Sequence, residues 1–370
     1  MMRRALEQLI LWLAPDHRKQ WAIAMTAEMS AIESDRNRMA FAWGCLIACF
    51  RFRLEWNRST RKSGSSIVKD RFVISTFIAG VMAGLVGLTY LLVSGAPPSM
   101  VIVNGSAIII GILLASFIKL AARVTDRVVA AIALIGAFIL LGTAISGYAI
   151  EDARRWLLIG PFFIQTSLIL LPLIAICFAR VQNVPTTVAV IVAAFAMAAQ
   201  PDRAMAGMLF VAVAIVGMMR PNWLSASAAL FCAMMFATTL LLPDRLPAVP
   251  FVDHILWSAF DIGLWVGLAL WAGCMLLVCP ILFTPKAERS ILHYVFASCW
   301  ATLIAAAAMG AYPTPIIGYG ASPIIGYFLS LIFLQPATDA HLAGDDDPES
   351  SCEANEATPP LRTNAPSFAI

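Results

Sequence analysis

Charged side chains are scarce in this sequence. They make up 13% of its 370 residues, whereas a soluble domain carries about 25%. Hydrophobic residues make up 60%, and the mean hydropathy is +0.82. So little charge excludes a cytosolic enzyme and a disordered chain, and the length and hydropathy exclude a small secreted disulfide scaffold. The composition predicts an all-α, polytopic membrane protein.

Common catalytic and metal-binding motifs are also missing. The sequence contains no phosphate-binding P-loop, no dinucleotide fingerprint, no HExxH zinc motif and no nucleophile elbow. Its eight cysteines have neither CxxC nor Cys/His spacing and lie mostly in apolar runs, so we interpret most of them as packing residues. The net charge of +3 gives no indication of nucleic acid binding. We expect no cofactor.

The charges that remain are concentrated at the two ends of the chain. Thirteen of the 25 Lys and Arg residues precede residue 72, and seven of the 22 acidic residues follow residue 336. We therefore expect a basic cytoplasmic segment of amphipathic helices (1–71), a membrane domain (72–336) and a disordered acidic tail (337–370). The apolar run near the start is too short for a signal peptide. The basic segment is interpreted as a membrane anchor or, alternatively, as a docking module for a cytoplasmic partner.

Apolar segments recur ten times in the membrane domain, which predicts ten transmembrane helices. The basic residues of the even-numbered connections place both termini in the cytoplasm by the positive-inside rule. We expect the long eighth segment to be strongly tilted or to extend beyond the bilayer. The segments are 72–95, 100–120, 127–148, 156–179, 185–199, 204–219, 223–242, 255–283, 290–311 and 321–335.

The outer connections contain most of the acidic residues of the membrane domain. Four arginines also lie there, against the positive-inside tendency, and each is close to an acid in the sequence. One interpretation is a set of ion pairs that fix the outer helix ends. The other is a polar site at the outer leaflet, where arginines bind phosphate and a carboxylate acts as general base. The residues are Glu151, Asp152, Arg154, Arg155, Asp202, Arg203, Asp244, Arg245, Asp253 and, just inside the boundary, Asp261.

Three stretches of these connections resemble motifs of one membrane protein family. Residues 153–167 (ARRWLLIGPFFIQTS) resemble its G-A-R-R-W-I-x-L-G-P-F-x-F-Q-P-S-E, residues 200–202 (QPD) its Q-P-D, and residues 315–322 (PIIGYGAS) its P-x-I-S-Y-G-G-S. They follow the family's order, and the family also has ten spans. On these residues the chain resembles a divergent member of the SEDS family (shape, elongation, division, sporulation), the FtsW/RodA/SpoVE type of peptidoglycan glycosyltransferase.

A fourth stretch is similar to the family's loop around its presumed catalytic aspartate. Residues 246–257 (LPAVPFVDHILW) match L-P-E-x-H-T-D-F-I-F-A, which puts Asp253 on that aspartate, and Asp261 takes the place of the first of two glutamates. If the segment is helical, the two carboxylates lie on one face, two turns apart. The sequence departs from the family in lacking E-x-H-T, the second acid, the P-S-E of the fourth span and a lysine-bearing segment before the aspartate.

The resemblance implies a glycosyltransferase that polymerises lipid II, or acts on a related undecaprenyl-linked glycan, at the outer face of a bacterial inner membrane, in cell division or cell shape. It also implies a class B penicillin-binding protein as partner. Asp253 is expected to act as general base, with Asp261 as a second catalytic carboxylate. A divalent cation can assist, although no ligand cluster requires one. The expected substrate-binding residues are Arg154, Arg155, Trp156, Gln165, Asp202, Arg203, Arg245, Tyr319 and Ser322.

Two other functions stay open at the level of sequence. The departures from the family favour a degenerate SEDS-like scaffold that binds lipid-linked precursor or division partners without catalysis. A small-molecule or lipid transporter would require charged or discontinuous helices near mid-membrane, whereas the charges here gather at the outer boundary. Pro315, Gly318 and Gly320 predict either a plain tight turn or an irregular, re-entrant backbone, which is tolerated only where protein buries it or where it lines a cavity.

Overall fold

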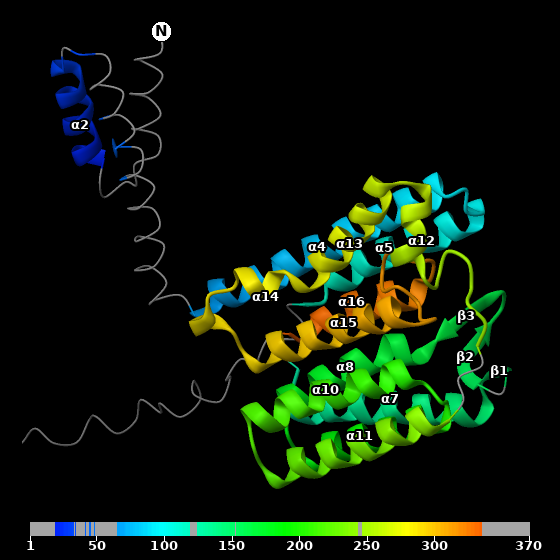
Figure 1. Ribbon diagram of the computed structural model, residues 1–370. Coiled ribbons are helices and arrows are strands. Elements are labelled where there is room, and N and C mark those ends of the chain that lie inside the picture. Colours follow the sequence, from blue (N-terminus) through cyan, green and yellow to red (C-terminus); the bar gives the residue numbers. More distant parts are fainter. Residues whose placement is uncertain are drawn as a thin grey trace, which may run out of the picture.

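The computed structural model describes residues 19–32, 34, 41, 44–45, 48, 65–118, 124–151, 153–242 and 246–334. One helix of the basic N-terminal segment is described, α2 (Lys19–Ala31). The acidic tail predicted for 337–370 and most of the N-terminal segment lie outside the described residues. The account that follows concerns the helices of the membrane domain and the connections between them (Figure 1).

Each of the ten predicted apolar segments contains one apolar helix of at least 12 residues. Five of them are long and apolar enough to cross a membrane, and α8, α9, α10, α13 and α16 are shorter. The all-α membrane fold predicted from composition is therefore confirmed. The helices are α4 (Ser65–Val93), α5 (Pro98–Ala115), α7 (Asp126–Ser146), α8 (Thr166–Arg180), α9 (Val184–Ala199), α10 (Arg203–Met219), α11 (Trp223–Leu241), α13 (Leu264–Val278), α15 (Ile291–Met309) and α16 (Ala321–Ile332).

The fourth predicted segment, 156–179, is only partly helical, and the prediction was wrong for its first ten residues. These residues belong to a three-stranded antiparallel sheet of β1 (Tyr148–Ile150), β2 (Ala153–Ile159) and β3 (Phe162–Gln165). Gly160, with φ +59°, and the proline that follows form the two-residue turn between β2 and β3. A positive φ and a proline both interrupt a helix, so α8 begins only at Thr166.

The eighth predicted segment, 255–283, is not one long, tilted helix, and this expectation was also wrong. It is divided into α12 (Ile255–Ile262), α13 and α14 (Pro280–Phe283). The break between α12 and α13 falls at Gly263. A Cβ on Gly267 would collide with the ring of Phe260, so α12 folds back closely against the start of α13. Of the three, only α13 is among the apolar helices of at least ten residues, and α12 packs against it.

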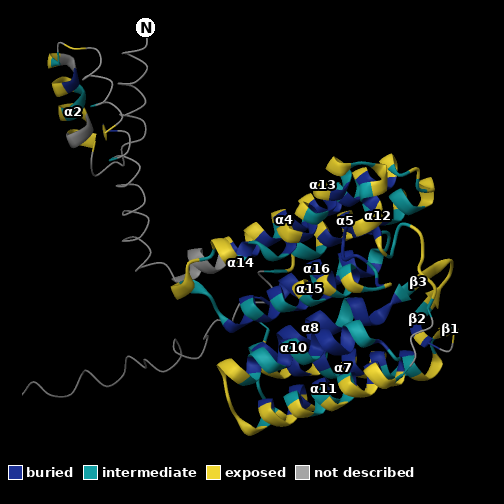
Figure 2. Cartoon of the chain, viewed as in Figure 1, coloured by how far each residue is buried: buried dark blue, intermediate teal, exposed yellow. Residues whose placement is uncertain are grey.

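The centre of the bundle is formed by α8, α15 and α16. α16 packs on α4, α5 and α8, and α15 packs on α8, α10 and α13. Figure 2 shows these central helices mostly in the colour of buried residues. α16 approaches α8 closely, because a Cβ on Gly326 would collide with the carbonyl oxygen of Leu168 and lie 3.0 Å from the Cα of Ile169. Small residues at such contacts let two helix backbones approach each other within a membrane.

Large apolar side chains cover the outer faces of the peripheral helices. This is the surface expected of helices in contact with lipid, because lipid solvates apolar side chains that water would exclude. The central helices carry few such residues, so the exposed apolar surface belongs to the perimeter of the bundle. Examples are Ile74, Ile78 and Leu92 on α4, Ile102, Ile109 and Leu113 on α5, Ile135 and Phe138 on α7, Leu230 and Leu241 on α11, and Leu264 and Trp265 on α13.

Candidate functional site

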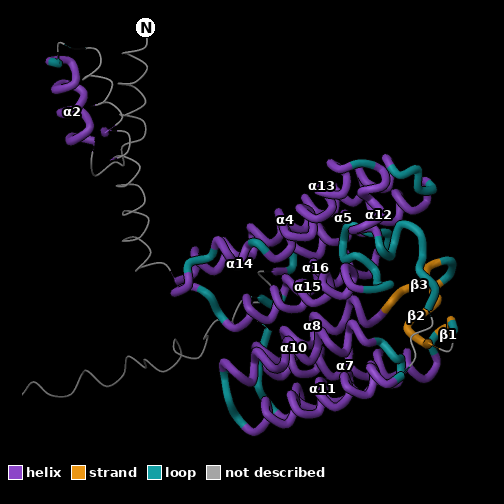
Figure 3. Tube along the Cα trace, viewed as in Figure 1, coloured by secondary structure: helices purple, strands orange, loops and turns teal. Residues whose placement is uncertain are grey.

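The described residues among those selected from the sequence gather at one end of the bundle. The sheet β1–β3, residues 246–254 and the 310–320 connection between α15 and α16 lie there, and we call it the hairpin end (Figure 3). The short connections 181–183, 220–222 and 284–290 lie at the opposite end. Successive helices run in opposite directions, so alternate connections come to the same end. Motifs that are up to 170 residues apart in the sequence therefore meet.

Asp253 lies in a tight turn directly before α12. Its backbone N–H donates to the Val249 carbonyl at 3.0 Å, and its Oδ2 accepts a hydrogen bond from the Val249 N–H at 2.8 Å. The other oxygen, Oδ1, is buried and has no hydrogen-bond partner among the described residues. The backbone thus orients the carboxylate through one oxygen and leaves the other able to accept a proton.

Burial raises the pKa of the Asp253 carboxyl above its ordinary value. The hydrogen bond from Val249 and the neighbouring His254 act in the opposite direction without cancelling the effect of burial. Because burial disfavours the charged form, the carboxylate binds a proton more strongly than an exposed aspartate does. A raised pKa makes the carboxylate a stronger base than an exposed aspartate, which favours a role as general base.

Asp253 and Asp261 do not lie on one helix, so the predicted alignment of the two carboxylates was wrong. α12 begins at Ile255, and His254 has φ +59°, in the left-handed region, so the helix does not extend back to Asp253. Asp261 lies in the last turn of α12 and is exposed. Asp253 is the half-buried acid of the two and Asp261 the exposed one, and a catalytic role for either stays a prediction.

The 310–320 connection packs against the segment that carries Asp253. The Thr314 N–H donates to the Val252 carbonyl at 3.1 Å, and the Tyr319 N–H donates to the Phe251 carbonyl at 2.7 Å. Residues 314–318 are buried, and Ile316 has φ +66°. A β-branched residue in the left-handed region is held there only by the surrounding structure. The connection is therefore irregular backbone buried in protein, as one of the two sequence interpretations predicted.

A buried polar cluster lies between the sheet, α10 and the 310–320 connection. The Gln165 amide Nε2 lies within 3.3–3.4 Å of Ser167 Oγ, Asp202 Oδ2 and Tyr312 Oη. Ser167 Oγ also donates to Asp202 Oδ2 at 3.2 Å, and the Gln165 N–H donates to Ser322 Oγ at 3.0 Å. The other oxygen of Asp202 accepts from the Met205 N–H and caps α10. The polar cluster consists of Arg155, Gln165, Ser167, Asp202, Tyr312 and Ser322.

No side chain of the polar cluster is more than 6% exposed. The Arg155 guanidinium donates to the carbonyls of Gln200 and Pro201. Burial and the charge of Asp202 raise the pKa of Tyr312 well above its ordinary value, so its hydroxyl stays protonated. These contacts tie β2, β3, α8, α10 and the 310–320 connection together. The substrate-binding role expected of Arg155, Gln165, Asp202 and Ser322 stays a prediction, and the contacts seen here are internal to the protein.

The remaining predicted residues are distributed around the hairpin end. Arg154 is exposed and donates to the Ile145 carbonyl. Arg203 donates to the carbonyls of Thr239 and Leu242, which joins the start of α10 to the end of α11. Trp156 and Tyr319 are partly buried, and Trp156 pairs with Gln165 across the sheet. Arg245, Asp152 and Asp244 lie outside the described residues, so the structure assigns them no position.

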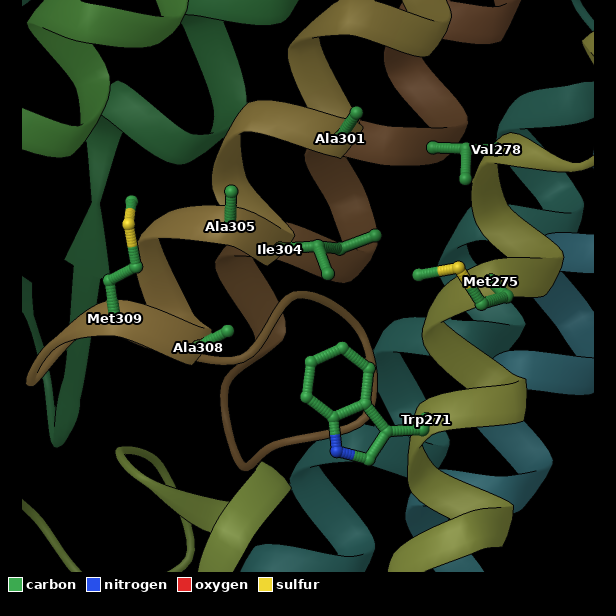
Figure 4. Close-up of a pocket in the computed structure, with 8 residues that line it drawn as sticks. All are labelled: Trp271, Met275, Val278, Ala301, Ile304, Ala305, Ala308 and Met309. Carbon is green, nitrogen blue, oxygen red and sulfur yellow. The ribbon is translucent and has the colours of Figure 1, made fainter.

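An apolar groove of about 360 Å³ lies between α13 and α15 (Figure 4). Its lining is almost wholly apolar, so it offers no group that could transfer a proton or bind a phosphate. At the hairpin end the Trp257 indole N–H donates to the Ala308 carbonyl at 2.8 Å, and the Trp257 and Trp271 rings meet edge to face. The groove belongs to the apolar perimeter rather than to the site around Asp253. It is lined by Trp271, Met275, Val278, Ala301, Ile304, Ala305, Ala308 and Met309.

Sequence reasoning missed three residues of this region. Asn104 on α5, Tyr312 and Thr314 are each at most 5% exposed, and the Thr314 hydroxyl has no partner among the described residues. Asn104 could have been found in the sequence, because an amide in an apolar helix is costly to bury unless it is hydrogen-bonded.

Within the part of the chain that the structure describes, no three His, Cys, Asp or Glu side chains are grouped to hold a metal ion.

Comparison with known proteins identifies the fold. No protein-family model and no curated protein sequence matches the chain. The crystal structure of the rod shape determining protein RodA of Thermus thermophilus matches with a TM-score of 0.51 and 18% identity, over 71% of this chain and 94% of RodA. A mutant of the same RodA matches with a TM-score of 0.51 and 18% identity, over 71% of this chain and 95% of the mutant. A chain from a peptidoglycan synthase complex is 19% identical, with a TM-score of 0.46, over 71% of this chain and 96% of that chain. The chain therefore has the RodA-like, polytopic membrane fold that the SEDS resemblance predicted.

Proposed function

We propose that this protein is a SEDS-like glycosyltransferase of the bacterial inner membrane, active in cell division or cell shape. It polymerises lipid II, or acts on a related undecaprenyl-linked glycan, at the hairpin end, which faces the outside of the cell. The observation that carries the proposal is the placement of Asp253. Its carboxyl is oriented by Val249, is raised in pKa by burial and has no hydrogen-bond partner at the buried Oδ1 among the described residues, at the position that matches the presumed catalytic aspartate of the family.

The chemistry requires one proton acceptor and a stabilised leaving group. Asp253 removes the proton of the incoming sugar hydroxyl while the hydroxyl oxygen bonds to the anomeric carbon of the other sugar. The bond from that carbon to the lipid pyrophosphate breaks, and the pyrophosphate leaves with the electron pair. Arg154, exposed at the same end, is the described cation best able to approach its negative charge. By the family resemblance, a class B penicillin-binding protein would be the partner in the membrane.

The test is glycan synthesis from labelled lipid II by wild type and by Asp253→Asn. Moenomycin in the assay silences unrelated class A polymerases, and a candidate class B partner is co-expressed. We expect the wild type to make glycan and Asp253→Asn to lose activity at least about 100-fold, the usual contribution of a general base. Asparagine keeps the size of the side chain and an acceptor for the Val249 N–H, so folding is preserved. Asp126→Asn, at the opposite end of α7, is the matched control and should keep full activity.

A catalytically degenerate scaffold is the second candidate, and one observation favours it. Arg154, Arg155 and Arg203 all donate to backbone carbonyls, and only Arg154 is exposed among the described arginines of the hairpin end. This function predicts that neither wild type nor Asp253→Asn makes glycan, and that Asp253→Ala complements a deletion normally. A transporter is less well supported, because Asp, Glu, Lys and Arg occur only near the ends of the described spans. Counterflow of a labelled solute in proteoliposomes would support the transporter function.

A further inference from the structure

Asn104 is a buried amide in a helix that is otherwise nearly all apolar. It lies in the second turn of α5, near the hairpin end, and its side chain is 1% exposed. Its Nδ2 donates to the Gly318 carbonyl at 3.0 Å, and its Oδ1 accepts from the Gly320 N–H at 2.9 Å. Both ends of the amide are thus bonded to the 310–320 connection. A buried amide is stabilising only when such bonds are made, and here both go to that connection.

The same connection is bonded to the two residues before Asp253. The Tyr319 N–H, between the two glycines held by Asn104, donates to the Phe251 carbonyl, and the Thr314 N–H donates to the Val252 carbonyl. The approach is close, because a Cβ on Gly318 would lie 3.1 Å from the Val252 oxygen. A displacement of residues 318–320 therefore moves residues 251–252 as well, and with them the carboxylate that follows.

We propose that Asn104 is a positioning residue that fixes the Asp253 segment through its two hydrogen bonds to the 310–320 connection. The side chain reaches no reacting atom and acts through the backbone of residues 318–320 and 251–252. The catalytic consequence rests on the proposed function, whereas the structural coupling does not. A base displaced by a fraction of an ångström to one ångström loses rate while substrate binding is retained.

Hydrogen exchange of the purified full-length protein tests the coupling directly. Asn104→Leu removes both hydrogen bonds and keeps a similar volume. We expect amide exchange in residues 249–253 and 312–320 to accelerate about tenfold, with α8, α15 and α16 unchanged. The matched control is Thr76→Val, which removes a buried hydroxyl of α4 that donates within its own helix, to the Phe72 carbonyl. It should leave exchange in both segments at the wild-type rate.

If Asn104→Leu is not recovered folded from membranes, Asn104→Ala serves in its place. It removes both hydrogen bonds without burying a charge, so the same two segments should exchange faster. Unchanged exchange of residues 249–253 in a folded Asn104 variant overturns the proposal. Equal acceleration throughout the bundle also overturns it, because that result shows a general loss of stability rather than positioning.

Lipid II polymerisation tests the catalytic consequence. We expect kcat of Asn104→Leu, per folded molecule, to fall about tenfold with little change in KM, and Thr76→Val to match the wild type. An unchanged kcat despite faster local exchange shows that Asn104 does not position the base. If the wild type itself makes no glycan, the proposed function fails, and the exchange measurement still decides whether Asn104 fixes the Asp253 segment.

Discussion

The protonation of the Asp253 carboxyl, which is held in a backbone turn, should determine how polymerase activity depends on pH. Its raised pKa means that the side chain is protonated, and unable to act as a base, at pH values where an exposed aspartate (pKa about 3.9) is already ionised. We therefore expect kcat/KM for lipid II polymerisation to fall as the pH drops through this raised value. An acid limb within the range of an exposed aspartate would contradict the assignment of Asp253 as the base.

The same shift has a consequence for stability. The unfolded chain ionises Asp253 at the lower pH, so the stability that the neutral carboxyl provides is lost as the pH rises from about 3.9 through the folded-state pKa. Asp253→Asn removes this loss. At neutral pH the variant should have a Tm equal to or above that of the wild type, while its activity is abolished. A variant that is less active because it is less stable would show the opposite change in Tm.

Residue types in the sequence indicated the chemistry of the hairpin end better than its contacts. The arginines and acids of 153–167 and 200–202 were predicted to share one site, and Arg155, Gln165 and Asp202 do meet. The sequence left open whether they face a substrate or one another. In the structure they are buried and hydrogen-bonded within the protein, which depends on which elements cover the cluster, and a substrate-binding role stays a prediction. Asn104 is a similar case, because one asparagine in an apolar helix indicates a buried polar contact but not the residue that it binds.

Helix packing at the centre of the molecule depends on a glycine. A Cβ on Gly326 would collide with the Leu168 carbonyl oxygen, and backbone cannot be displaced as a flexible side chain can. We expect Gly326→Ala to separate α16 from α8 and to destabilise the protein by about 1–3 kcal/mol, as over-packing of a core does. Thermal unfolding in detergent measures the change.

Gly105→Ala is the matched control for this prediction. It also replaces a helical glycine, in α5, but a Cβ there has no atom within 4 Å. Its Tm should be unchanged or slightly higher, because alanine has the better helix propensity. Equal losses of Tm in the two variants would show that the close contact between α8 and α16 is not what matters.

The pattern of apolar residues predicts the boundaries of helices and strands poorly in two places. Residues 156–165 are as apolar as the helix that follows, and an apolar run of this length fits either a strand or a buried helix. Gly160 and Pro161 form the turn that pairs β2 with β3, and the prediction of a single helix over 156–179 did not take them into account. The break between α12 and α13 at Gly263 was missed for a similar reason, because hydropathy does not indicate where the backbone changes direction.

The arrangement of connections in the whole molecule predicts their exposure to the two sides of a membrane. Pro161, in the β2–β3 turn, and Pro221, between α10 and α11, are both exposed and lie at opposite ends. In spheroplasts, a membrane-impermeant maleimide should label Pro161→Cys directly and Pro221→Cys only after permeabilisation. The background variant replaces Cys49, Cys279 and Cys352 by serine. If only Pro221→Cys is labelled in intact spheroplasts, the protein has the opposite orientation in the membrane to the one predicted.

The sequence by itself determined the class of the protein and the apolar helices of the described membrane domain, and it led to the prediction that Asp253 is the catalytic acid. These follow from composition, hydropathy and residue type, which are local properties of the chain. Only the tertiary structure decided that Asp253 precedes α12 instead of sharing a helix with Asp261, that the polar cluster is buried, and that Asn104 reaches the connection next to Asp253. Burial, pKa and hydrogen-bond partners depend on which distant segments pack together, and that is settled by the whole fold.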